Sequence, residues 1–113
     1  MENNQAAKKA FARYAERQGR PPKNPNELNE HIAVVTTIAH LESEGKSRCV
    51  EAVRFVYFYD PKNIHHKGEV DRRVARYSVR CNVPTRTTYR WLATACQLYE
   101  ASMTALTKLV END

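Results

Sequence analysis

Arg86 and Arg90 are four residues apart, a spacing that puts both guanidinium groups on one face of a helix, one turn from each other. A guanidinium group is a rigid fork of N–H donors that forms paired hydrogen bonds with the edge of a guanine. Hydroxyl side chains on the same turns can bond base edges, and a threonine methyl can touch that of thymine. We therefore predict that this segment contacts bases in double-stranded DNA, through Thr85, Arg86, Thr87, Tyr89 and Arg90.

A second group of cations precedes this segment. Residues 54–90 contain nine Lys/Arg against three Asp/Glu, which accounts for the whole surplus behind the net charge of +5. Concentrated positive charge is typical of proteins with a polyanionic partner, and the alternative is a solvated basic face. We predict phosphate contacts from Lys67, Arg72, Arg73, Arg76 and Arg80.

The elements that must position these side chains have the pattern of a helix-turn-helix at about residues 69–98. A helix is expected over 69–81, a turn over 82–84 and a second helix from about Thr85, with Thr85 as its N-cap. Ser78 is small enough for the helices to cross, and Asn82 tolerates the left-handed backbone of the turn. The inward positions are Val74, Tyr77, Cys81, Val83, Thr88 and Trp91.

The rest of the chain also shows helical periodicity, so an all-α fold is predicted. Helices are expected over residues 4–18 and 27–44, the second capped by Asn26, and three prolines make 20–26 a non-helical arm. Residues 47–59 favour a helix, although the aromatic and β-branched run at 53–59 also suits a strand. The predicted organisation is an N-terminal helix and arm over 1–26, followed by a helical DNA-binding domain over 27–113.

The last helix, expected over about 85–110, is long for a recognition helix. Its apolar residues recur by sevens and form one stripe: Leu92, Tyr99 and Leu106; Ala95, Ser102 and Leu109; Cys96, Met103 and Val110. Two interpretations stay open for this stripe. It packs on the earlier helices of the same chain, or it forms the seam of a homodimer.

The run Val83-Pro-Thr-Arg-Thr-Thr-Tyr-Arg-Trp-Leu92 resembles the recognition helix of sigma-factor region 4 and of small phage regulators, which commonly read V-S-x-x-T-V-Y-R-W-L. Pro84 replaces the usual Ser or Thr cap, and Thr88 replaces an aliphatic residue. The aromatic-rich segment 50–59 before it resembles the late antitermination (Q-type) proteins of lambdoid phages and prophages. Over residues 48–100, the resemblance implies a DNA-binding transcription regulator whose partners include bacterial RNA polymerase and sigma factor. Some members of this group carry a zinc site, but this chain lacks their cysteine cluster.

Other classes of function find less support. No apolar run approaches a membrane span and no signal peptide is visible, so a cytoplasmic protein is expected. Cys49, Cys81 and Cys96 lack metal-ligand spacing and are expected as reduced core thiols, and we expect no metal or other cofactor and no enzymatic activity. Two alternatives remain: a small terminase-like packaging protein, and a metal-dependent nuclease using Asp60, Glu69, Asp71, His65 and His66.

Overall fold

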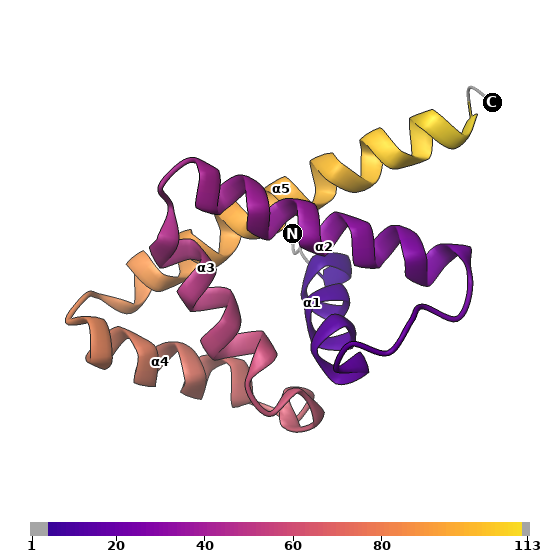
Figure 1. Ribbon diagram of the computed structural model, residues 1–113. Helices are drawn as coiled ribbons and strands as arrows, with labels where there is room; N and C mark the ends of the chain where they lie inside the picture. Colours follow the sequence, from indigo (N-terminus) through magenta and orange to yellow (C-terminus); the bar gives the residue numbers. More distant parts are fainter. Residues whose placement is uncertain (1–4, 112–113) are drawn as a thin grey trace.

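The computed structural model describes residues 5–111, which contain helices and turns and no strand (Figure 1). The prediction of an all-α fold with a long C-terminal helix is confirmed. The helices are α1 (Gln5–Arg17), α2 (Pro25–Ser43), α3 (Ser47–Val53), the π-helical turn η1 (Arg54–Phe58), the short 3-10 helix η2 (Pro61–Asn63), α4 (Glu69–Cys81) and α5 (Thr85–Glu111).

The core forms where α5 crosses the other helices. Phe11 of α1 is fully buried, and its ring centroid lies 5.8 Å from those of both Tyr57 and Tyr99. Ala7 and Ala10 are completely covered as well. Helix α1 is therefore built into the same hydrophobic core as η1 and α5.

The apolar stripe of α5 is largely covered within the chain. Leu92, Ala95, Cys96 and Tyr99 are buried, whereas Leu109 near the end of the helix is 66% exposed. The outer turns of α5 project beyond the body of the molecule (Figure 1). The first interpretation of the stripe thus holds for its inner half, and the outer end remains uncovered.

Helix α2 starts earlier than predicted. Its N-cap is Asn24 rather than Asn26, and the Asn24 side chain accepts a 2.9 Å hydrogen bond from the Glu27 amide. Pro25 occupies the first helical position, where a missing N–H costs nothing because that group has no intrahelical acceptor. The carboxylate of Glu27 in turn accepts a bond from the Lys23 amide, which fixes the entry to the helix.

Residues 47–58 are helical, as favoured by the sequence, but the helix widens into the π-turn η1 after Val53. Val56 and Tyr57 of this turn are buried, and the chain leaves it at Tyr59 in an extended conformation. Burial of these apolar side chains against α1 and α4 stabilises a helix even where residue type favours strand. Within residues 5–111, no helix combines the length and apolar character needed to cross a lipid bilayer.

Candidate nucleic-acid interface

The turn between α4 and α5 is built on Asn82. Its backbone lies in the left-handed region at φ 58° and ψ 49°, as predicted from its residue type. The amide of Val83 donates to the Ser78 carbonyl at 3.0 Å, and that of Asn82 donates to the Val79 carbonyl at 3.1 Å. These bonds satisfy carbonyls at the end of α4 and turn the chain sharply into α5.

Contacts between small and apolar side chains lock the two helices together. The hydroxyls of Ser78 and Thr88 share a buried 2.7 Å hydrogen bond at the helix crossing. Val74 and Tyr77 are buried beside it, and Trp91 meets the Tyr77 ring edge-on at 6.3 Å. Thr88, which stands where the motif that this segment resembles has an aliphatic residue, is fully buried with its hydroxyl satisfied.

Helix α5 starts at Thr85 as predicted, but its N-cap differs from the prediction by one residue. The helix begins at Thr85, so Pro84 rather than Thr85 occupies the N-cap position, and the Pro84 carbonyl accepts the Thr87 amide at 3.0 Å. Thr85 is exposed and Thr87 is half-buried. The hydroxyl of Thr85 is thus on the surface at the tip of the helix.

Arg86 and Arg90 are both exposed on the side of α5 that faces away from the core. Within residues 5–111, neither guanidinium group takes part in a hydrogen bond or ion pair with another side chain. Thr88 and Leu92, which are buried, fix the opposite side of the same turns. The two arginines therefore project in parallel from a rigid support, one helical turn apart.

Tyr89 has a more restricted place than the other predicted base contacts. Its hydroxyl donates a hydrogen bond to the Asp71 carboxylate and so links α5 to the first turn of α4. Burial, together with this bond, raises the pKa of the Tyr89 phenol to about 12. The residue remains 41% exposed, but its hydroxyl is already engaged inside the chain.

Four of the five predicted phosphate contacts are exposed side chains: Lys67, Arg72, Arg76 and Arg80. Arg72 forms a 3.0 Å ion pair with Glu69 at the start of α4, and Arg80 lies over the Phe55 ring at 6.0 Å from its centroid. A further cation that was not predicted, Arg48 of α3, lies beside this surface, and its guanidinium donates to the Cys81 sulfur at 3.2 Å. No local pattern indicates this neighbour, because it is 33 residues away in the chain.

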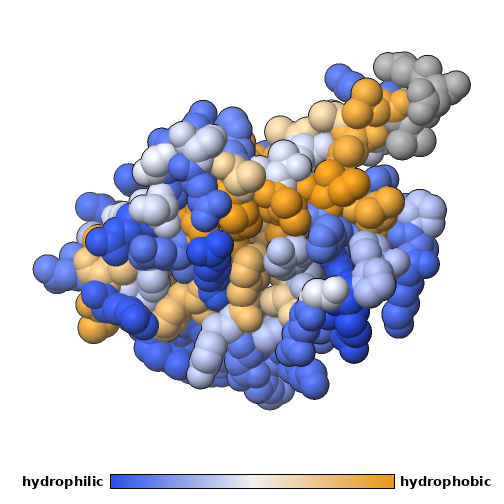
Figure 2. Space-filling model, viewed as in Figure 1, coloured by the Kyte–Doolittle hydropathy of each residue, from blue (hydrophilic) through white to orange (hydrophobic). Residues whose placement is uncertain are grey.

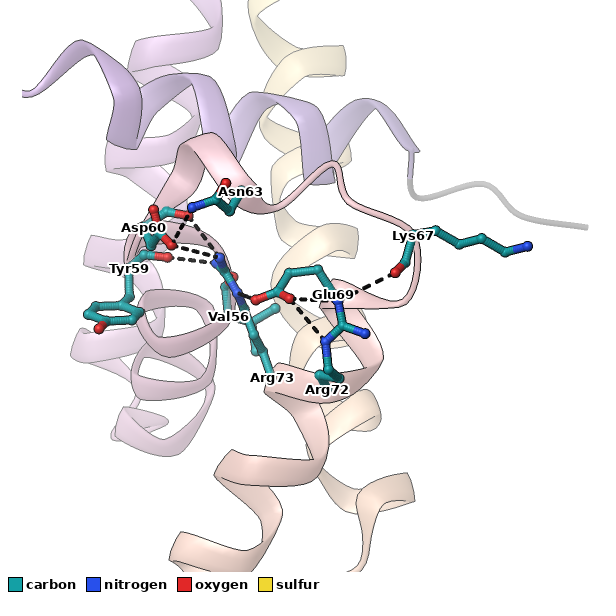
Figure 3. A network of polar contacts seen from close by, with 8 residues as sticks. All are labelled: Val56, Tyr59, Asp60, Asn63, Lys67, Glu69, Arg72 and Arg73. Carbon is teal, nitrogen blue, oxygen red and sulfur yellow. Dashed lines mark hydrogen bonds and ion pairs between the residues drawn. The ribbon is translucent and has the colours of Figure 1, made fainter.

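Arg73, the fifth predicted phosphate contact, was assigned wrongly, because it is only 2% exposed. Its guanidinium donates to the carbonyls of Val56 at 2.8 Å, Tyr59 at 2.6 Å and Asp60 at 2.8 Å, and to the Glu69 carboxylate at 2.7 Å (Figure 3). The carbonyls of Val56 and Tyr59 lie where η1 ends and helical donors run out, whereas that of Asp60 also accepts the Asn63 amide at 3.3 Å. Arg73 therefore closes the end of one helix with a side chain from another and cannot reach a phosphate.

Glu69 completes this network from the first turn of α4. Hydrogen bonds from Arg73 and then Arg72 hold the pKa of its carboxyl below the ordinary value. Two of the acidic residues considered for a nuclease site therefore have separate partners: the Glu69 carboxylate accepts hydrogen bonds from Arg72 and Arg73, and the Asp71 carboxylate accepts one from Tyr89. Among residues 5–111, no three His, Cys, Asp or Glu side chains gather as a metal-binding group.

Cys49 and Cys96 lie in the core as expected, whereas Cys81 is half-buried beside Arg48.

Comparisons of this chain with protein families, with curated proteins and with solved structures find no match. A function is therefore inferred from the geometry of α4, the Asn82 turn and α5, and from the resemblance of residues 83–92 to known recognition helices.

Proposed function

We propose that this protein binds double-stranded DNA through α4, the Asn82 turn and α5, and that it regulates transcription. The observation that carries the proposal is the pair Arg86 and Arg90, exposed and without partners among residues 5–111, on the outer side of a helix whose inner side is locked to α4 through Thr88 and Ser78. Arginines presented in this way at the first turns of a helix suit guanine edges in the major groove.

The surrounding charge supports the same assignment. Arg72, Arg76 and Arg80 are exposed along α4, which in a helix-turn-helix complex crosses the DNA backbone, and Arg48 lies at its end. Phosphate contacts from such side chains fix orientation without reading sequence. The base-contacting residues in this proposal are Thr85, Arg86, Thr87 and Arg90, with Tyr89 contributing its ring.

The resemblance of residues 83–92 and 50–59 to phage regulators supports a narrower form of the proposal. In that form the protein is a phage or prophage antiterminator that acts in the cytoplasm, where it contacts RNA polymerase and sigma factor beside its DNA site. A transcription assay with purified bacterial polymerase tests this narrower form. We expect the protein to increase read-through of a terminator, and only on templates that carry its DNA site. Unchanged read-through would limit the proposal to DNA binding.

The DNA-binding proposal is tested by selecting a preferred duplex from a random library and titrating variants against it and a scrambled duplex. Arg86→Ala should lose about 1–3 kcal/mol on the selected site and relax preference at one base pair. Arg76→Ala should weaken both duplexes alike, because a phosphate contact carries no sequence information. Lys108→Ala, an exposed cation at the far end of α5, is the matched control and should change neither affinity.

Two results would contradict the assignment of α5 as a recognition helix. If no duplex is enriched, or if Arg86→Ala lowers affinity for selected and scrambled duplexes by the same factor, α5 is not a recognition helix. The basic surface would then be a general polyanion-binding face.

A further inference from the structure

Helix α2 presents an apolar face to solvent. On this face Leu28 is 47% exposed, Ile32 37% and Val35 44%, and Ala39 is also exposed. Figure 2 shows apolar surface gathered in a band along α2 and continuing onto the projecting end of α5. At that end Leu109 is 66% exposed. The band is therefore formed by two helices on one side of the molecule.

The opposite face of α2 is apolar as well. Ala33, Val34 and Leu41 are completely buried there, together with Thr37, whose hydroxyl bonds the Ala33 carbonyl at 2.7 Å. A helix that is apolar on both sides is typical of one that is covered on both sides. Within residues 5–111, the chain itself covers only one of them.

The exposed residues Leu28, Ile32, Val35 and Ala39 are spaced by four, three and four residues. This alternation of four and three is the spacing of a coiled-coil seam, in which each residue meets a partner helix. It differs from the scattered single apolar residues that are normal on protein surfaces.

We propose that this face binds a second copy of the same chain, as an antiparallel pair of α2 helices related by a two-fold axis. The spacing is symmetric about the point between residues 33 and 34. Ile32 would therefore face Val35 of the second copy, and Leu28 would face Ala39, so that each large side chain meets a smaller one. An isologous interface requires this kind of self-complementarity.

Charge permits the pairing. Between residues 28 and 41 the single formal charge is Glu30, and its carboxylate is already bonded to Arg13 at 3.0 Å. No like charges from this stretch would therefore meet across the axis, and it contains no Lys or Arg to attract a nucleic acid. A second copy fits this neutral, apolar and symmetric face.

The exposed apolar side chains of this band form a patch of the size that often marks an interaction site. Leu28, Ile32, Val35 and Leu109 together expose on the order of 300 Å². The remaining surface of the outer α5 turns has few charges, since only Glu100 and Lys108 are ionisable in residues 99–110 apart from Tyr99. The neutral surface of α2 around these side chains and the outer turns of α5 would supply the rest of the roughly 800 Å² per partner of a standard interface.

Sedimentation equilibrium at about 100 µM protein tests the proposal, since a specific dimer should be populated at that concentration. We expect twice the chain mass for the wild type. The double variants Ile32→Glu with Val35→Glu, and Ile32→Lys with Val35→Lys, should each have the mass of one chain, because like charges would meet at the axis. An equimolar mixture of the two should recover the dimer mass, because opposite charges then face each other.

Controls separate this interface from misfolding and from DNA binding. Circular dichroism should show wild-type helicity in both double variants, because the substituted side chains are partly exposed. Val79→Glu changes an apolar side chain that is 82% exposed on α4, away from this band, and should leave the dimer intact. Arg86→Ala should also remain dimeric, so loss of DNA binding and loss of the dimer are distinguishable.

Three results would overturn the proposal. One is a wild type with the mass of a single chain, which would mean that α2 is covered by something other than a second copy. Another is an acidic double variant that stays dimeric while Leu109→Glu does not, which would move the seam to α5. An assembly of eight or more copies would indicate a ring of the terminase type instead of a two-fold dimer.

Discussion

At the scale of single residues, Asn82 determines how the chain turns between α4 and α5. Its φ of 58° is costly for a β-branched side chain and is readily adopted by glycine. We expect Asn82→Gly to be neutral or slightly stabilising, and Asn82→Val to lower the free energy of unfolding by about 1–2 kcal/mol. Urea denaturation measures both, with Thr107→Val on the exposed side of α5 as a control at negative φ.

An Asn82→Val variant as stable as the wild type would show that the left-handed turn does not constrain this position. The Asn82→Gly variant separates backbone strain from loss of the side chain, because it removes the asparagine amide as well. Equal loss in both variants would point to the side chain instead of the backbone.

At the scale of elements, Arg73 joins α4 to the end of η1. Replacing Arg73 by Met would leave the buried Val56 carbonyl without its donor and Glu69 with one arginine fewer. We expect a loss of about 2–4 kcal/mol in the free energy of unfolding, because buried polar groups are costly when unpaired. Arg72→Met is the matched comparison on the preceding residue, and should cost less than about 1 kcal/mol because its ion pair is exposed.

Thermal or urea unfolding of the two variants measures both losses in the free energy of unfolding. If Arg73→Met and Arg72→Met are equally stable, the carbonyl network of Figure 3 does not hold η1 against α4. DNA affinity measured on the folded fraction should fall with Arg72→Met, which removes an exposed cation, and should stay unchanged with Arg73→Met, because Arg73 cannot reach a phosphate.

At the scale of the whole molecule, the cations on the α4 and α5 side should make DNA binding strongly dependent on salt. This side exposes four predicted phosphate contacts, Lys67, Arg72, Arg76 and Arg80, and Arg48 lies beside them. About four to five phosphates should therefore be neutralised on binding. We expect log K to fall against log salt with a slope of about −4. Fluorescence anisotropy at several salt concentrations measures it, and Arg76→Ala should reduce the slope by about one. A slope near zero would argue against DNA as the partner.

Features that depend on near neighbours in the chain could be predicted from the sequence. Helical periodicity indicated the all-α fold, and the residue types of Asn82, Ser78 and Thr88 indicated the turn and the helix crossing that the structure contains. Each of these follows from the conformational preference or the size of one residue within about ten positions of its partner. The outward direction of Arg86 and Arg90 followed from the same helical period.

Which charged and apolar side chains are exposed depends on how distant segments pack in the folded chain. Arg73 has the residue type of its neighbours Arg72 and Arg76, yet it is buried because the end of η1, thirteen to seventeen residues earlier, places carbonyls against it. The uncovered face of α2 was likewise invisible in the sequence, since apolar residues on both sides of a helix do not show which side the chain covers. Burial depends on contacts between distant segments, and local periodicity carries no information about them.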